Sequence, residues 1–160
     1  MKKTIRLFAI FVVLFSTVTL MSSCKKDVSN LPGTWKALSA TIDGDYEDDI
    51  KDVWTFANGG SCHIQCDFDE YFDDVLFIDP DYDIIVFDGN YTTDGNKTLT
   101  ITSDKFHVYN DTYEQIVYNL DIQLLNKKNM IVDGTITWNR YEGNISTPKV
   151  ANITVTLSKK

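Results

Sequence analysis

The chain has 160 residues and a formal net charge of −8 at pH 7, and this length suits one domain with a hydrophobic core of its own. The acidity argues against nucleic acid as a partner, because the phosphate backbone repels a negative surface. Arg140 is the only arginine after residue 6, so anionic ligands, which arginine binds through paired hydrogen bonds, are disfavoured as well.

The chain begins with a basic stretch, residues 2–6, before an apolar run from Leu7 to Leu20. A bilayer-spanning helix needs about 20 apolar residues, whereas a secretory signal has a basic head and a shorter apolar centre. The run ends in Met21-Ser22-Ser23-Cys24, which resembles the lipobox of bacterial lipoproteins. The resemblance implies that residues 1–23 are a signal peptide and that Cys24 carries the lipid, with palmitate among its acyl chains. An ordinary signal peptide with an incidental cysteine is the alternative.

The same resemblance implies a location and domain boundaries. In the Gram-negative lipoproteins that the motif resembles, Asp directly after the cysteine retains the protein at the inner membrane, and Lys25 stands there instead. We therefore expect a lipid anchor in the outer membrane, with the periplasmic face and the cell surface both open. Several acyl chains make such an anchor effectively permanent. Residues 24–30 are expected to form a tether and residues 31–160 the folded domain.

The first elements of the domain are a strand over residues 36–42, an acidic connection and a hairpin. The connection, Asp43 to Asp52, is interpreted as a loop or a single helical turn. The hairpin joins Trp54–Ala57 to Ser61–Phe68 through Asn58-Gly59-Gly60, because glycine adopts positive φ at low cost.

Two cysteines lie on the second strand of this hairpin. On a regular strand the Cα atoms of Cys62 and Cys66 would be about 13 Å apart, whereas a disulfide spans less than about 7 Å. We expect two free, buried thiols; a redox pair would require a bend in the strand. Alternation sends His63 to the opposite face, so these three side chains are not expected to converge on a metal ion.

An acidic segment follows, from Asp67 to Asp83. Phe68, Phe72 and Val75 have helical spacing within it, which favours a short helix near residues 67–77. A flap at the rim of the domain is the alternative.

Most of the remaining chain alternates apolar and polar residues, as strands with one buried face do. Residues 85–91 and 99–101 are joined by Asp94-Gly95-Asn96, and residues 106–109 form a short element.

The clearest hairpin runs from Tyr113 to Trp138 around the turn at residues 126–129, with Leu124 predicted to be the last inward residue before the turn. A loop from Asn139 to Pro148 is expected before a final strand over residues 151–157. Seven or eight strands in chain order predict an antiparallel meander, which removes its free edges by closing on itself. We therefore expect an all-β fold, an antiparallel up-and-down barrel of eight strands.

Three short motifs carry a resemblance to a known family. Gly33-Thr34-Trp35 looks like the Gly-x-Trp signature of lipocalins. Together with residues 54–60 and with Gly89-Asn90-Tyr91 before Leu99-Thr100-Ile101, it resembles the lipocalin-like (calycin-type) domains of Gram-negative bacterial lipoproteins. The resemblance implies a lipocalin-like β-barrel with a cavity for a small hydrophobic molecule.

The resemblance also implies that Trp35 caps one end of the barrel beneath an arginine from near the last strand. Arg140, placed in the loop before that strand, departs from the family pattern. Lys149 and Lys159 are the substitutes that the sequence offers.

Strand alternation places large side chains inside the predicted barrel. An eight-stranded barrel is just wide enough to be filled by its own side chains or to hold one small ligand. The bulk of the inward set favours a packed interior or a shallow site at the mouth, and an open apolar cavity is the alternative. The candidate ligand-binding residues are Trp54, Phe56, Phe87, Tyr91, Tyr118 and Trp138.

Catalytic and metal-binding motifs are not evident. The sequence contains no Gly-x-Ser-x-Gly elbow, and neither His63 nor His107 has an evident nucleophile on its own strand face. Residues 43–47 and 79–83 have the alternate carboxylates of calcium loops, but both lack the glycine at the sixth position and the acidic residue at the twelfth. We therefore expect no enzyme activity, no metal and no cofactor.

These observations lead to two functional hypotheses. The first is an outer-membrane lipoprotein whose lipocalin-like barrel binds a small hydrophobic molecule or a protein partner at its mouth, with residues 67–83 as a rim. The second is a structural or interaction subunit of a cell-envelope assembly that binds no small ligand.

Overall fold

The computed structural model describes residues 27–48, 50–67, 84–95, 97–109 and 112–160. Alternating side chains give strands almost throughout, and a single short 3-10 helix, η1 (Val28–Asn30), precedes them. The strands within these ranges are β1 (Gly33–Ile42), β2 (Asp45–Glu47), β3 (Val53–Phe56), β4 (Ser61–Asp67), β5 (Ile84–Asp94), β6 (Thr98–Ser103), β7 (Phe106–Tyr109), β8 (Thr112–Leu125), β9 (Asn129–Glu142) and β10 (Ile145–Lys159).

Eight of these strands form a closed antiparallel barrel, as the sequence predicted. Their order is β1, β3, β4, β5, β6, β8, β9 and β10. The last strand pairs back onto the first, from Trp35 opposite Lys159 to Ile42 opposite Ile153. The two short strands lie outside this cycle, β2 against β1 and β7 against β8.

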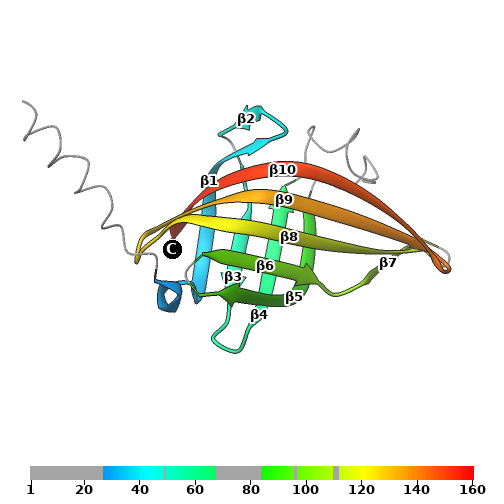
Figure 1. Ribbon diagram of the computed structural model, residues 1–160, viewed down its shortest axis with the longest axis horizontal. Helices are drawn as coiled ribbons and strands as arrows, with labels where there is room; N and C mark the ends of the chain where they lie inside the picture. The colour runs from blue at the N-terminus through cyan, green and yellow to red at the C-terminus, as the bar shows by residue number, and fades with distance from the viewer. Residues whose placement is uncertain (1–26, 49, 68–83, 96, 110–111) are drawn as a thin grey trace, which may run out of the picture.

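The barrel has two different ends, the closed end and the mouth. The closed end carries η1, the chain after β10 and the turns β3–β4, β5–β6 and β8–β9. The mouth carries β2, β7, the β9–β10 turn, the end of β4 and the start of β5. Figure 1 shows β8, β9 and β10 as one long curved band that projects past the barrel on the mouth side.

The alternating residues of β8–β10 point into the core. In β8, Ile116, Tyr118, Leu120 and Ile122 are buried. Most of the residues that pair with them across β9 and β10 are buried as well, namely Val132, Ile136, Trp138, Ala151, Ile153 and Val155. Complete burial of such a side chain contributes about 1.5–3 kcal/mol. The hydrophobic pattern therefore determines which face of each strand lies inside.

A β-bulge changes this pattern near the end of β8. Ile122 is opposite Val132, whereas Leu124 is opposite Ile131, so an extra residue is inserted at Gln123. Such a bulge shifts the following side chains by one position. Leu125 is fully buried in consequence, and the prediction that Leu124 continues the inward face was wrong.

Two predicted connections proved to be strands. The loop expected from Asn139 to Pro148 was wrong, since β9 continues to Glu142 and β10 begins at Ile145 after a turn at Gly143 with φ 59°. The pairing of β10 with β1 ends at Ile153 on the mouth side. Pro148 lies nearer the mouth, on a part of β10 that pairs only with β9 among the described strands, so its missing N–H can face away from the sheet. The helical turn considered for residues 43–52 is replaced by β2.

Two groups of predictions lie outside the described residues. They are the signal peptide with Cys24, and the short helix near residues 67–77 with Phe68. Within the ranges that the structure describes, no helix has both the length and the apolar character needed to cross a bilayer.

Candidate functional site

Five of the six candidate ligand-binding residues form one chain of contacting rings inside the barrel. The ring of Tyr91 meets Phe56 at 5.0 Å between centroids, Phe56 meets Trp54 at 6.4 Å, Trp54 meets Tyr118 at 5.4 Å and Tyr118 meets Phe87 at 6.4 Å. Such contacts stabilise aromatic pairs beyond the area that they bury. All except Tyr91 are buried; Tyr91 lies at the closed end, where its hydroxyl donates to the carbonyl of Ala57 at 2.7 Å.

Trp54 has an unused donor at the centre of this chain. Its side chain is 0% exposed, and its Nε1 has no hydrogen-bond partner in the part of the chain that the structure describes. A buried N–H without an acceptor costs about 1–3 kcal/mol, and native proteins contain few of them. An acceptor oxygen from a ligand or a water molecule at this point would satisfy the donor.

The polar tips beside Trp54 are uncharged at neutral pH. The hydroxyl of Tyr118 lies 3.3 Å from the Sγ of Cys66, and both are buried. Burial first, and the neighbouring Cys66 and Asp52 next, raise the pKa of Tyr118 well above its ordinary value. Burial, followed by the charges of Asp88 and Asp104, raises the pKa of Cys62 to about 11.

The two thiols are free, as predicted. Cys62 and Cys66 are both buried on the inner face of β4. His63 points outward from the same strand and is exposed, with its Nδ1 2.8 Å from Oδ1 of Asp88. The strand is regular between the cysteines, so their separation follows from strand geometry.

The sixth candidate, Trp138, belongs to a second group nearer the mouth. Its ring meets Phe106 edge to face at 6.2 Å, and its Nε1 donates to Oε2 of Glu114 at 2.8 Å. The other oxygen of Glu114 accepts from Nε of Arg140 at 2.7 Å and lies 2.6 Å from Nη2. The Glu114 side chain is only 3% exposed, so an ion pair bonded to a tryptophan is buried on the inner face of the strands near the mouth.

Sequence reasoning missed the pairing of Glu114 with Arg140, although a signal for it exists. Glu114 occupies the same alternation as Ile116 and Tyr118, and Arg140 the same alternation as Ile136 and Trp138. The two residues are direct cross-strand neighbours. A charge at an inward position requires a partner, because an unpaired buried charge is far too costly.

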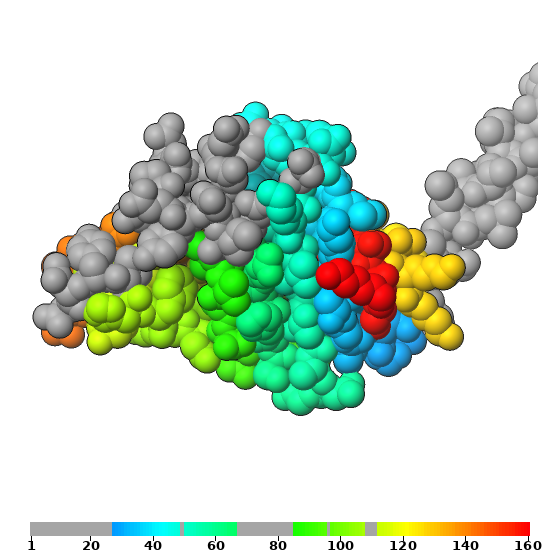
Figure 2. Space-filling view, turned by 180° about the vertical axis from the view of Figure 1, so that it is seen from behind, coloured from blue at the N-terminus to red at the C-terminus, as the bar shows by residue number. Residues whose placement is uncertain are grey.

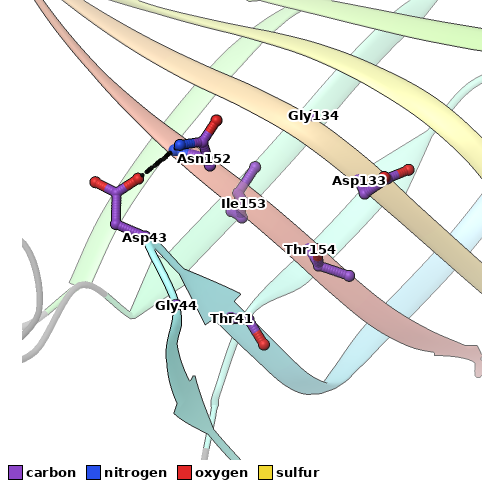
Figure 3. Close-up of a pocket in the computed structure, with 8 residues that line it drawn as sticks. All are labelled: Thr41, Asp43, Gly44, Asp133, Gly134, Asn152, Ile153 and Thr154. Carbon is purple, nitrogen blue, oxygen red and sulfur yellow. Dashed lines mark hydrogen bonds between the residues drawn. The ribbon is translucent and has the colours of Figure 1, made fainter.

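Two shallow depressions lie on the outer surface of the barrel. One, of about 350 Å³, lies over His63, Asp88 and Asp104. The other, of about 320 Å³, lies over β1, β9 and β10. In Figure 3, Asp43 and Asn152 are joined across the second depression, whereas Asp133 lies apart from them.

Asp43 has a structural role at the edge of this depression. Its Oδ1 accepts from the backbone N of Asn152 at 2.7 Å and from its Nδ2 at 3.1 Å, which ties the β1–β2 turn to β10. Among the described residues, no three or more His, Cys, Asp or Glu side chains are grouped as metal ligands would be.

The closed end is built around Trp35. This ring is fully buried, and its Nε1 donates to the carbonyl of Leu31 at 2.8 Å. The Nζ of Lys159 lies 5.0 Å from the ring centroid and donates to the carbonyls of Asn30 and Pro32, at 2.6 Å each. The cation above Trp35 is therefore Lys159 of the last strand, whereas Arg140 lies in β9 at the mouth.

Comparisons with known proteins identify no family or function for this chain. No family model matches the sequence, and neither the curated proteins nor the solved structures contain a significant match.

Proposed function

We propose that this protein is a lipid-anchored lipoprotein of the outer membrane whose lipocalin-like barrel binds a small, uncharged, apolar molecule that carries a hydrogen-bond acceptor. The anchor is assigned to Cys24 from the motif Met21-Ser22-Ser23-Cys24. The family assignment is supported by the closed eight-stranded barrel and by Trp35 beneath Lys159 at its closed end.

One observation carries the ligand proposal, namely the unpartnered Nε1 of Trp54 within a chain of aromatic rings. An acceptor oxygen at this point would remove the cost of the orphaned donor, while the surrounding rings bury the apolar part of the molecule. Because Cys62 and Tyr118 stay protonated at neutral pH, these two groups beside the aromatic rings provide no charge to balance a charged ligand. Desolvating a charged ligand there would be expensive, which favours a neutral one.

The residues at the mouth also favour an uncharged, apolar ligand. Glu114 and Arg140 neutralise each other, and the rings of Trp138 and Phe106 lie beside them. A neutral molecule passing this region displaces no buried ion, whereas an anion would compete with Glu114 for Arg140.

The test is purification of the protein from its own membrane, followed by native mass spectrometry and extraction of any bound molecule. Titration with the neutral apolar fluorophore N-phenyl-1-naphthylamine then compares the wild type with Trp54→Phe and with Tyr113→Phe, an exposed aromatic control. We expect Trp54→Phe to weaken binding of the extracted acceptor-bearing ligand about five- to tenfold, the effect of one hydrogen bond. Tyr113→Phe should not change it. A barrel that is isolated empty and binds no apolar probe would contradict the carrier function.

A second function is favoured by a different observation. Tyr113 and Val150 are large, exposed side chains on the outer face of β8 and β10, and Ile145 is exposed on the other face of β10; all three lie on the part of these strands that extends past the pairing with β6 and β1. Exposed apolar residues gathered in one region mark protein contacts. Under this alternative the protein is an interaction subunit of a cell-envelope assembly.

Photo-crosslinking in intact cells distinguishes the two functions. A photoreactive residue at Ile145 should give one reproducible protein adduct if the projecting strands are an interface, and the same group at Gly59, at the closed end, serves as control. Absence of an adduct from Ile145, together with a co-purified small molecule, would favour the carrier.

A further inference from the structure

The lysines of the barrel are concentrated at its closed end. Five of them lie there, in the β5–β6 turn, the β8–β9 turn and the end of β10 with the residue after it: Lys97, Lys127, Lys128, Lys159 and Lys160. All except Lys159 are classed as exposed. The described acidic residues at this end are Asp27 and Asp94, with Asp121 and Asp133 beside the β5–β6 turn, where Asp121 pairs with Thr98 and with Asp133. Asp27 accepts from the backbone N of Ser29 at 3.0 Å. The turns at this end therefore present mainly lysines on an acidic protein.

Backbone hydrogen bonds hold these lysines on one continuous surface. The carbonyl of Lys97 accepts from the N–H of Ile122 at 2.6 Å, and the carbonyl of Lys128 accepts from the N–H of Lys159 at 2.8 Å. The N–H of Lys160 donates to the carbonyl of Thr34 at 2.9 Å. Figure 2 shows the result, with the red C-terminal residues between the yellow β8–β9 turn and the blue N-terminal residues.

The mouth has the opposite charge. Asp43, Asp45, Asp48, Asp104 and Glu142 are exposed there. These exposed carboxylates outnumber the three described lysines on that side, Lys51, Lys105 and Lys149. The molecule is therefore electrically polar along its length.

The two ends act on their surroundings separately. Strand β8 alone has 14 residues, which corresponds to a length of roughly 45 Å. Even with the tilt of a barrel strand, the distance between the two ends is several times the Debye length of about 8 Å at physiological salt. The interaction between a charged surface at one end and the charges at the other end is therefore largely screened.

The N-terminal segment enters the barrel at the basic end. Asp27 is the first described residue, and its carbonyl accepts from the N–H of Asn30 in the η1 turn at 2.9 Å. Only Lys25 and Lys26 separate Asp27 from Cys24, and three residues span at most about 11 Å. An acylated Cys24 would therefore hold the closed end within roughly one Debye length of the lipid headgroups.

We propose that the closed end docks on the anionic phospholipid surface of the membrane, with the mouth held away from it. This proposal rests on the acylation of Cys24 for the proximity of the two surfaces, whereas the charge pattern is a property of the barrel alone. Lysines near an anionic bilayer each strengthen binding about fivefold. The acidic mouth is repelled by the same surface, so both ends favour one orientation.

The orientation is measured on the acylated protein reconstituted in vesicles of phosphatidylcholine, with or without about 30% phosphatidylglycerol. Donor dyes are attached to Gly59→Cys, at the closed end, or to Ile145→Cys, at the mouth, and acceptors lie among the headgroups. Both positions accept a label, since nothing lies within 4 Å of a Cβ at Gly59 and Ile145 is 70% exposed. Cys62 and Cys66 are buried and react slowly.

We expect stronger energy transfer from position 59 than from position 145, with a larger difference in the anionic vesicles. K97Q/K127Q/K128Q should reduce the difference to its value in neutral vesicles, as should 0.5 M salt. K51Q/K105Q/K149Q removes the same number of charges from the mouth side and should preserve the difference. Equal transfer from both positions, or a difference that is insensitive to lipid charge, would overturn the proposal.

A second measurement separates this proposal from the acylation of Cys24. The chain from residue 24 onwards contains η1 and every described strand, so the Cys24→Ser protein without residues 1–23 retains the whole barrel. Its sedimentation with phosphatidylglycerol vesicles should weaken at least tenfold in K97Q/K127Q/K128Q and little in K51Q/K105Q/K149Q. Failure of acylation would appear only in the mass of the N-terminal peptide. Equal binding of the two triple variants to the vesicles would overturn the membrane docking and leave the acylation of Cys24 untouched.

Discussion

Lys159 lies above Trp35 and joins the two ends of the chain at the closed end of the barrel. Its Nζ is 5.0 Å from the ring centroid, and the same group donates to the carbonyls of Asn30 and Pro32. Trp35 and Lys159 are also register partners in the β1–β10 pairing that closes the barrel. The Lys159 side chain therefore makes a cation–π contact and two hydrogen bonds at the point where the first and last strands close the barrel.

Replacement of Lys159 by Met should lower the free energy of unfolding by about 2 kcal/mol. The variant loses two charge-assisted hydrogen bonds and the cation above the ring. Urea unfolding followed by tryptophan fluorescence measures the change. Lys160→Gln, which removes an exposed neighbouring charge, should have little effect, and equal losses in the two variants would contradict the role of Lys159.

Arg140→Met should destabilise the barrel by about 3–5 kcal/mol, because the carboxylate of Glu114 would remain buried without its cation. Adding Glu114→Gln should recover part of this loss, and the coupling energy from the double-mutant cycle measures it. Glu142→Gln, an exposed site on the same strand, should change stability by less than about 0.5 kcal/mol. Strict additivity of the two core substitutions would show that they do not form a unit.

Gly134→Ala should destabilise the protein by about 3 kcal/mol or prevent folding. Gly134 has φ 156°, and a Cβ there would overlap the carbonyl oxygen of Asn119 and lie 2.9 Å from the Cα of Leu120. Both neighbours are backbone atoms of β8, which cannot move without breaking the pairing. Gly59→Ala is the control, because its Cβ would meet nothing within 4 Å. Thermal unfolding of the two variants gives the comparison.

Stability should fall as the pH rises above 9. The pKa of Cys62 is raised from 9.0 to about 11 in the folded protein, so the unfolded state loses its proton first, and folding is disfavoured between these two values. Below pH 9 this contribution is fully present. From pH 9 to pH 10 the loss should be about 1 kcal/mol. Urea unfolding at both pH values, compared with Cys62→Ala, isolates the effect, and an identical slope in the variant would exclude Cys62 as its source.

Trp54→Phe and Trp35→Phe should differ in their cost for the unliganded protein. Both indoles are 0% exposed, but Trp35 donates to Leu31 whereas the Nε1 of Trp54 has no partner among the described residues. Trp35→Phe leaves the Leu31 carbonyl without its donor and should cost about 1–2 kcal/mol more than Trp54→Phe. The free energies of unfolding of the two variants, measured after removal of any bound molecule, decide this. Equal costs would mean that the donor of Trp54 is satisfied in solution.

Much of the barrel was predictable because strand geometry is local. The alternation around Tyr118 and Trp138 placed both inside, and Cys62 and Cys66 were expected to be free thiols from the rise of a strand alone. Errors arose where a local rule was broken by pairing. The bulge at Gln123 moved Leu125 inward, and cross-strand bonds extended β9 through residues that have the composition of a loop.

The candidate site was predictable only in part. Five aromatic residues were expected inside and proved to be in contact. Which ring contacts which depends on the pairing of the strands, and the sequence does not give that pairing. The inward positions of Glu114 and Arg140 were visible in the alternation. Their pairing required the register of β8 with β9, which a tertiary contact sets.

The sequence by itself determined an all-β chain, the inward face of its long strands and the free state of its thiols, because each follows from a period of two residues along an extended backbone. The tertiary structure alone decided that Lys159, and not Arg140, covers Trp35, since that contact depends on the pairing of the first strand with the last. It also decided that lysines from separate turns share one end of the barrel. These arrangements join residues far apart in the chain, and only closure of the sheet brings them together.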